Sequence, residues 1–273
     1  LTRPKQENPE KRCALASDQT NSSNKKLKLH PGWILPLFYR PARTTKEIVS
    51  QEKPVWLTPL LILSVLVILF TLVAAPIRRN AVQMGSEPPP DFQYYSPEQQ
   101  EQYFAAQATT TSPMMLYIFP MLGGLIKTWL SWFLLSILLY LSLTLAGSRA
   151  GSMRSYNLVA WSMLPLALRF IVQAVAVLAS KSLINAQGLS GFIDSEATGI
   201  SAYLRGILGS LDIYFIFQVV LLLIGVIPLS GLSRTKAWVA TAISIVILLL
   251  LLGVPSLVSS ALSGLSLSGG FYF

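Results

Sequence analysis

Cysteine and histidine are almost absent from this sequence of 273 residues. It holds one cysteine, Cys13, and one histidine, His30, and both lie in the polar N-terminal stretch. An internal disulfide needs two cysteines, and zinc sites of the thiolate or HExxH kind need several cysteines or two histidines. The composition therefore excludes these sites and predicts a protein without a cofactor.

The sequence also lacks a complete catalytic motif. Residues 188–191, Gly-Leu-Ser-Gly, match the GxSG of rhomboid-type intramembrane serine proteases, but that chemistry needs a histidine at membrane depth to accept the serine proton. An intramembrane aspartyl protease needs two aspartates within spans, and only Asp212 comes close to one. Phosphate-binding loops and dinucleotide fingerprints are missing as well. We therefore expect no enzymatic activity.

Charged residues are scarce and unevenly distributed. They make up 12% of the chain, about half the usual share of a soluble domain, and eleven of the 21 lysines and arginines lie within residues 1–53. No basic helix face interleaved with stacking aromatics is present, so the net charge of +9 does not indicate nucleic-acid binding. We expect residues 1–35 to be a disordered basic tail. The basic segment 25–53 should contact anionic lipid, with a short interfacial helix at about 43–53.

Long apolar runs dominate the rest of the sequence. A bilayer core about 30 Å thick is crossed by a helix of roughly 20 apolar residues. Five stretches qualify, which predicts spans at about 54–76, 128–147, 157–179, 211–232 and 237–258. Core helices of soluble proteins are rarely so long and apolar on every side, and the alternation of a transmembrane strand is missing. The predicted fold class is an all-α integral membrane bundle of five transmembrane helices, preceded by a basic cytoplasmic tail.

Three segments between the spans carry weaker signals. Residues 114–126 are apolar but short and contain two adjacent glycines, so they are interpreted as an interfacial segment that leads into the second span. Ser96 and Gln99 flank a proline in a capping pattern, which predicts a short polar helix over about 97–108. The other long loop, 181–210, is rich in glycine and serine.

Positive residues at the span ends favour a cytoplasmic N-terminus and an external C-terminus. The proposed inner side carries Arg40, Arg43, Lys46, Lys53, Arg149, Arg154, Arg234 and Lys236. The opposite side holds fewer positive residues and six acidic ones. Tryptophans fall near the predicted interfaces, at Trp56, Trp129, Trp132, Trp161 and Trp238. We expect a membrane domain over 36–262 and a short C-terminal tail over 263–273.

Two charged residues fall at membrane depth and a third lies near an interface. Arg169 interrupts the third apolar run, and Asp212 opens the fourth span from the outer side. A charge in this environment is costly and tends to find a partner inside the bundle. We predict that Arg169 pairs with Asp212 and that Lys127, at the start of the second span, lies nearby. The group serves either as an ion pair that holds helices together or as a polar pathway for an ion or a lipid headgroup.

Three segments, in order, resemble the Ypt-interacting-protein (YIP) family in its bacterial form. The first runs from Phe38-Tyr39-Arg40-Pro41 through Trp56-Leu57-Thr58-Pro59, the entry into the first span. The second, Ser152 to Gln173, contains Leu164-Pro165 inside the third span. The third runs from Leu211-Asp212 through Gly225 to the turn Gly231-Leu232-Ser233-Arg234, followed by Lys236. The resemblance covers about residues 36–262.

The resemblance implies five spans, a cytoplasmic N-terminus and no enzymatic activity. Eukaryotic members bind small Rab-type GTPases, but their acidic N-terminal region and aspartate-leucine-tyrosine-glycine signature are not found in this sequence. Bacterial members act as accessory proteins, for instance of export-type ABC transporters. The first expectation is therefore a scaffold or accessory protein of the inner membrane whose partners are the bilayer and another membrane protein, for example such a transporter. The alternative is a small permease, channel or lipid-moving protein that uses Arg169 and Asp212.

Overall fold

The computed structural model describes residues 29–84, 91–184 and 186–268. This part of the chain is helical and contains no strand. Five helical stretches are long and apolar enough to cross a membrane, and they cover Leu57–Gln83, Met114–Leu145, Ser152–Ser180, Ile213–Ser230 and Arg234–Leu262. The predicted all-α membrane class with five spans is thus confirmed.

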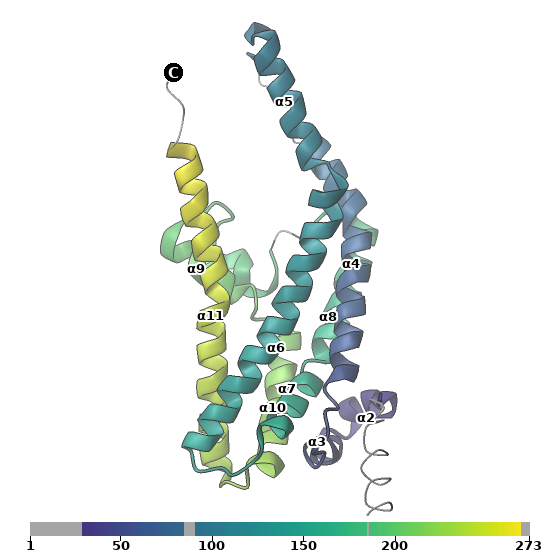
Figure 1. Cartoon of the computed structure of the whole chain (residues 1–273), viewed down its shortest axis with the longest axis vertical. Helices are drawn as coiled ribbons and strands as arrows, with labels where there is room; N and C mark the ends of the chain where they lie inside the picture. Colours follow the sequence, from purple (N-terminus) through teal and green to yellow (C-terminus); the bar gives the residue numbers. More distant parts are fainter. Residues whose placement is uncertain (1–28, 85–90, 185, 269–273) are drawn as a thin grey trace, which may run out of the picture.

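The helices that form these spans are α4 (Leu57–Met84), α6 (Phe119–Leu145), the pair α7 (Ser152–Ser162) and α8 (Pro165–Ser180), α10 (Ile213–Ser230) and α11 (Arg234–Ser268). They lie side by side in one bundle (Figure 1). Short helices α2 (Ile34–Tyr39) and α3 (Pro41–Val49) pack at one end, preceded by a 3-10 turn, Pro31–Trp33. The opposite end carries α5 (Pro97–Thr110), α9 (Gly199–Leu208) and the end of α11.

The interior of the bundle is apolar and closely packed. Leu63 of α4, Leu139 of α6, Leu158 of α7 and Val226 of α10 are all fully or almost fully buried. Gly225 of α10 faces Leu158, and a Cβ at this glycine would collide with the leucine Cδ1. Small residues at such a crossing allow two helices to approach closely, which is how membrane helices gain packing energy.

The outer surface of the bundle is apolar as well. Val65, Leu69 and Leu72 of α4 are each about half exposed, and the other spans carry similar side chains on their outer faces. Exposed apolar surface of this extent is stable only in contact with lipid. The observation agrees with the membrane class predicted from the sequence.

Two spans begin or end elsewhere than predicted. Helix α6 is preceded directly by a π-helical turn, Met114–Ile118, so residues 114–126 are part of one continuous helical stretch and not a separate interfacial segment. The two glycines do not interrupt the helix. A Cβ at Gly124 would lie only 2.7 Å from Cγ1 of Val67 on α4, so the glycine allows the two helices to approach closely. Close packing between α4 and α6 therefore accounts for the glycine at position 124. Helix α4 likewise continues past residue 76 to Met84.

The third span is interrupted where its proline lies. Helix α7 ends at Ser162, and α8 starts at Pro165, which has no N–H to donate to the carbonyl of Trp161. Leu164 N–H donates to that carbonyl instead, at 3.2 Å, which tightens the chain locally.

The predicted tails and short helices also differ in extent. Of the predicted tail 1–35, residues 1–28 lie outside the described residues, but regular structure already begins at Pro31. The interfacial helix predicted at 43–53 corresponds to α3, which is shorter and runs from Pro41 to Val49. It begins at Pro41 because proline suits the first turn of a helix, and after Val49 the chain turns toward α4. At the other end α11 is helical to Ser268, beyond the boundary expected at 262. Helix α5 has the predicted capping box between Ser96 and Gln99.

Candidate functional site

Arg169 and Asp212 are in direct contact. The Arg169 Nε lies 2.9 Å from Oδ2 of Asp212, and both side chains are about 15% exposed. Arg169 Nη2 also donates a hydrogen bond of 3.1 Å to the carbonyl oxygen of Gly209. The guanidinium therefore joins α8 to the segment that leads into α10.

Local structure fixes Asp212 in this position. It is the N-cap of α10, and its Oδ1 accepts a hydrogen bond of 2.8 Å from the backbone N–H of Phe215. An aspartate at an N-cap satisfies an otherwise unpaired amide and interacts favourably with the helix dipole. Each carboxylate oxygen thus has a different partner, one in the helix and one in Arg169.

Lys127 is not part of this ion pair. It lies two turns into α6 with an exposed side chain, close enough to Arg169 for their positive charges to repel each other. Its side chain lines a cavity at the end of the bundle that carries α9. The three residues proposed from the sequence are therefore neighbours, but only two of them form an ion pair. Their use in function stays a prediction.

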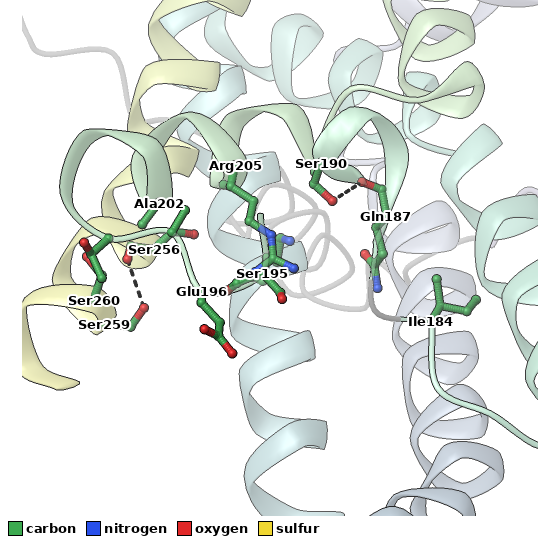
Figure 2. Close-up of a pocket in the computed structure, with 15 residues that line it drawn as sticks. Ile184, Gln187, Ser190, Ser195, Glu196, Ala202, Arg205, Ser256, Ser259 and Ser260 are labelled. Carbon is green, nitrogen blue, oxygen red and sulfur yellow. Dashed lines mark hydrogen bonds between the residues drawn. The ribbon is translucent and has the colours of Figure 1, made fainter. Parts of the chain in front are cut away.

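The cavity has a volume of about 630 Å³ and lies between α6, α9, α11 and the loop before α9. Its wall contains two cations, Lys127 and Arg205, and one carboxylate, Glu196. Most of the remaining polar wall is hydroxyl and amide groups, from Gln187, Ser190, Ser195, Thr198, Ser256, Ser259 and Ser260. Figure 2 shows Arg205 extending from α9 toward the middle of the cavity, close to Ser195. Arg205 Nη1 donates to the Ser195 carbonyl at 3.0 Å.

A tight crossing of α9 and α11 forms one wall of the cavity. A Cβ at Gly206 would collide with Ser256, and a Cβ at Gly253 would lie 2.7 Å from the ring of Tyr203. The Tyr203 hydroxyl donates a hydrogen bond of 2.9 Å to the carbonyl of Leu250. These contacts hold α9 against the last span.

The sequence analysis missed both α9 and the cavity, because the loop 181–210 was noted only for its glycine and serine content. The signal was present in the apolar spacing of Ile200, Tyr203, Leu204 and Ile207, which follows the helical period.

A second missed residue is Asn157, which is fully buried in α7. Its Oδ1 accepts from Val55 N–H at 3.0 Å, and its Nδ2 donates to the carbonyls of Lys53 and Gln51 at 2.9 and 3.3 Å. The Trp161 indole donates to Val55 O at 3.0 Å. A single asparagine inside an apolar run was the available signal, since such a group needs partners.

Ser190 of the Gly-Leu-Ser-Gly motif and the nearby Asp194 form hydrogen bonds within their own loop. Ser190 Oγ donates to the carbonyl of Gln187 at 2.7 Å, and Asp194 Oδ1 accepts from Glu196 N–H at 3.2 Å. Within residues 29–84, 91–184 and 186–268, no three His, Cys, Asp or Glu side chains are grouped to hold a metal ion.

Comparison with known proteins adds one finding. A family model described as the Yip1 domain matches residues 36–255, which is most of the chain. No curated protein and no solved structure matches significantly.

Proposed function

Because this chain belongs to the Yip1 domain family, we propose that it is a non-enzymatic scaffold or accessory protein of the cytoplasmic membrane. The observation that carries the proposal is the state of the charged pair. Arg169 and Asp212 neutralise each other, and both also bind backbone groups of the loop and helix that they join. A pair held in this way stabilises a helix arrangement and leaves no free charge to interact with a passing solute.

Polar groups deeper in the bundle support the same interpretation. Ser244 Oγ donates to Ser142 Oγ at 3.0 Å, and Ser148 Oγ donates to the carbonyl of Ser230 at 2.8 Å. Gln218 and Ser136 are buried as well, and Ser136 Oγ donates to the carbonyl of Trp132 in its own helix at 2.7 Å. Such contacts join helix to helix, whereas a pathway for ions needs polar groups that follow one another across the membrane.

We place the N-terminal end on the cytoplasmic side and the C-terminus outside. The end that carries α2 and α3 also carries Arg40, Arg43, Lys46 and Arg154, which agrees with the excess of positive charge on cytoplasmic loops. The exposed Lys46 of α3 would contact anionic lipid at that surface. The resemblance to bacterial YIP proteins supports a membrane-protein partner, and we propose an export-type ABC transporter.

Affinity capture from native membranes in mild detergent tests this function. The protein carries a purification tag, and the captured proteins are compared with those captured by an unrelated five-span protein of equal expression. Specific recovery of a transporter ATPase supports the accessory role.

The competing function is a permease, channel or lipid-moving protein, and vesicles distinguish it. Purified protein is reconstituted in vesicles, and ion flux and lipid movement between leaflets are measured. Transport by the protein alone, abolished in Asp212→Asn, would contradict the scaffold proposal.

A further inference from the structure

The cavity between α6, α9 and α11 is a second site, distinct from the charged pair. Its cations point to an anionic ligand. Lys127 and Arg205 outnumber the single carboxylate of Glu196, so the wall carries one net positive charge. This net charge is equal in size and opposite in sign to the single negative charge of a phosphodiester group.

Hydroxyl and amide groups make the wall suited to phosphate oxygens. Three serines of α11, Ser256, Ser259 and Ser260, line one side, and Gln187 lies on the other. Hydroxyl and amide N–H groups donate to oxyanions, and bonds to a charged acceptor are about twice as strong as those between neutral groups. The hydroxyls of Ser259 and Ser260 donate to carbonyls of their own helix. A phosphate placed beside Lys127 would therefore receive its hydrogen bonds from Gln187 and Ser256.

Position favours a lipid as the source of that phosphate. The residues that line the cavity come from α6, α9, α11 and the loop before α9, and α9 lies toward the end of the bundle opposite α2 and α3. The helices that form the cavity also carry exposed apolar side chains: Leu204 of α9 is 45% exposed, and Val258 of α11 and Ile126 of α6 are 50% and 61% exposed. A lipid with its headgroup in the cavity would have its acyl chains against these residues.

The walls are rigid enough to form a defined pocket. The glycine crossing of α9 with α11 and the bond from Tyr203 to Leu250 fix one side. Arg205 holds the loop at Ser195 through its backbone carbonyl. The site is therefore formed before a ligand arrives, which reduces the entropy lost on binding.

We propose that this cavity binds a phosphate group, most readily the phosphodiester of a membrane phospholipid at the end of the bundle opposite α2 and α3. Lys127 supplies the charge that recognises the phosphate, and Gln187 and Ser256 supply hydrogen bonds. The site goes beyond the accessory function proposed above, and partner capture does not depend on it.

Titration of the full-length purified protein tests the site. The protein is delipidated in a phosphorus-free detergent, and binding is followed by native mass spectrometry. Three probes are used: dioleoylphosphatidylglycerol, dioleoylglycerol with the same chains but no phosphate, and inorganic phosphate. The proposal expects saturable binding of the phospholipid and at least tenfold weaker binding of dioleoylglycerol.

Variants assign the binding to the cavity. Lys127→Gln should weaken phosphatidylglycerol binding about fivefold to tenfold, the usual effect of one charge-assisted hydrogen bond. Lys127→Arg should retain most of the affinity. Lys181→Gln is the matched control, because it removes the same charge from an exposed residue that does not line the cavity. Thermal melting of each variant confirms that it is folded.

The outcomes separate the possibilities. Displacement of the lipid by millimolar inorganic phosphate, with the same loss in Lys127→Gln, supports the phosphate chemistry and assigns a soluble phosphate compound as the source. Equal binding of dioleoylglycerol and phosphatidylglycerol overturns the proposal. Equal affinity of Lys127→Gln and the unchanged protein also overturns it.

Discussion

Asn157 Oδ1 accepts a hydrogen bond of 3.0 Å from the backbone N–H of Val55, which precedes it by 102 residues. The same carboxamide donates to the carbonyls of Gln51 and Lys53. One buried side chain therefore pairs with three backbone groups of the segment between α3 and α4. This bond network fixes the entry of the chain into its first span against the third.

Replacing Asn157 should destabilise the whole bundle. Asn157→Ala leaves buried backbone groups without partners, which should lower the free energy of unfolding by about 3 kcal/mol. Thermal melting in detergent measures the change as a lower Tm. Asn80→Ala is the control, because Asn80 is exposed on α4 and should melt like the unchanged protein. An unchanged Tm in Asn157→Ala would show that the entry segment is not held by this side chain.

A double-mutant cycle should reveal the coupling of Arg169 to Asp212. Asp212→Asn removes the charge but keeps an N-cap acceptor for Phe215 N–H, so it isolates the ion pair. Each of Asp212→Asn and Arg169→Gln should cost about 2–4 kcal/mol, because each leaves one poorly solvated charge unpaired. The double variant should cost clearly less than the sum of the two. Additive losses would contradict a direct pairing.

The crossing of α7 and α10 should depend on side-chain size at Gly225 and Leu158. Gly225→Ala introduces a collision with Leu158 and should destabilise the protein by about 1–3 kcal/mol. In a Leu158→Ala background the same change should cost much less, since the space has been vacated. Melting of all three variants in detergent provides the measurement. Gly123→Ala is the matched control: no atom lies within 4 Å of its added Cβ, and alanine favours the helix.

Cysteine labelling should establish the orientation in the membrane. In a Cys13→Ser background, Gln102→Cys places a thiol on the exposed surface of α5, and Lys46→Cys places one on α3. A membrane-impermeant maleimide added to intact cells should label the first and not the second. Lys46→Cys should react only after permeabilisation. The reverse pattern would overturn the proposed cytoplasmic N-terminus.

Features encoded in short stretches of sequence were predicted correctly. The length and composition of a run decide whether it crosses a membrane, so five spans were visible without any knowledge of packing. The capping box of α5 is local in the same way, since Ser96 and Gln99 bond within one turn. The family followed from motifs in order along the chain, and the match over residues 36–255 confirms it.

Features that depend on a distant neighbour were not predicted. Trp161 is fully buried, and its indole N–H donates to the carbonyl of Val55, a contact that the sequence did not indicate. The glycines before Lys127 favoured a separate interfacial segment, yet helix α6 runs through them, and Gly124 packs closely against Val67 of α4. Val55 and Val67, the contact partners in these two cases, cannot be identified from the residues next to Trp161 or Gly124 in the sequence.

The sequence by itself determined that this protein belongs in a membrane, because apolar length is a property of each segment alone. Tertiary structure alone decided that α9 crosses α11 at Gly206 and that Lys127 lines a cavity with Arg205. Those relationships arise from side chains brought together by packing, and their energy depends on contacts between residues far apart in the chain.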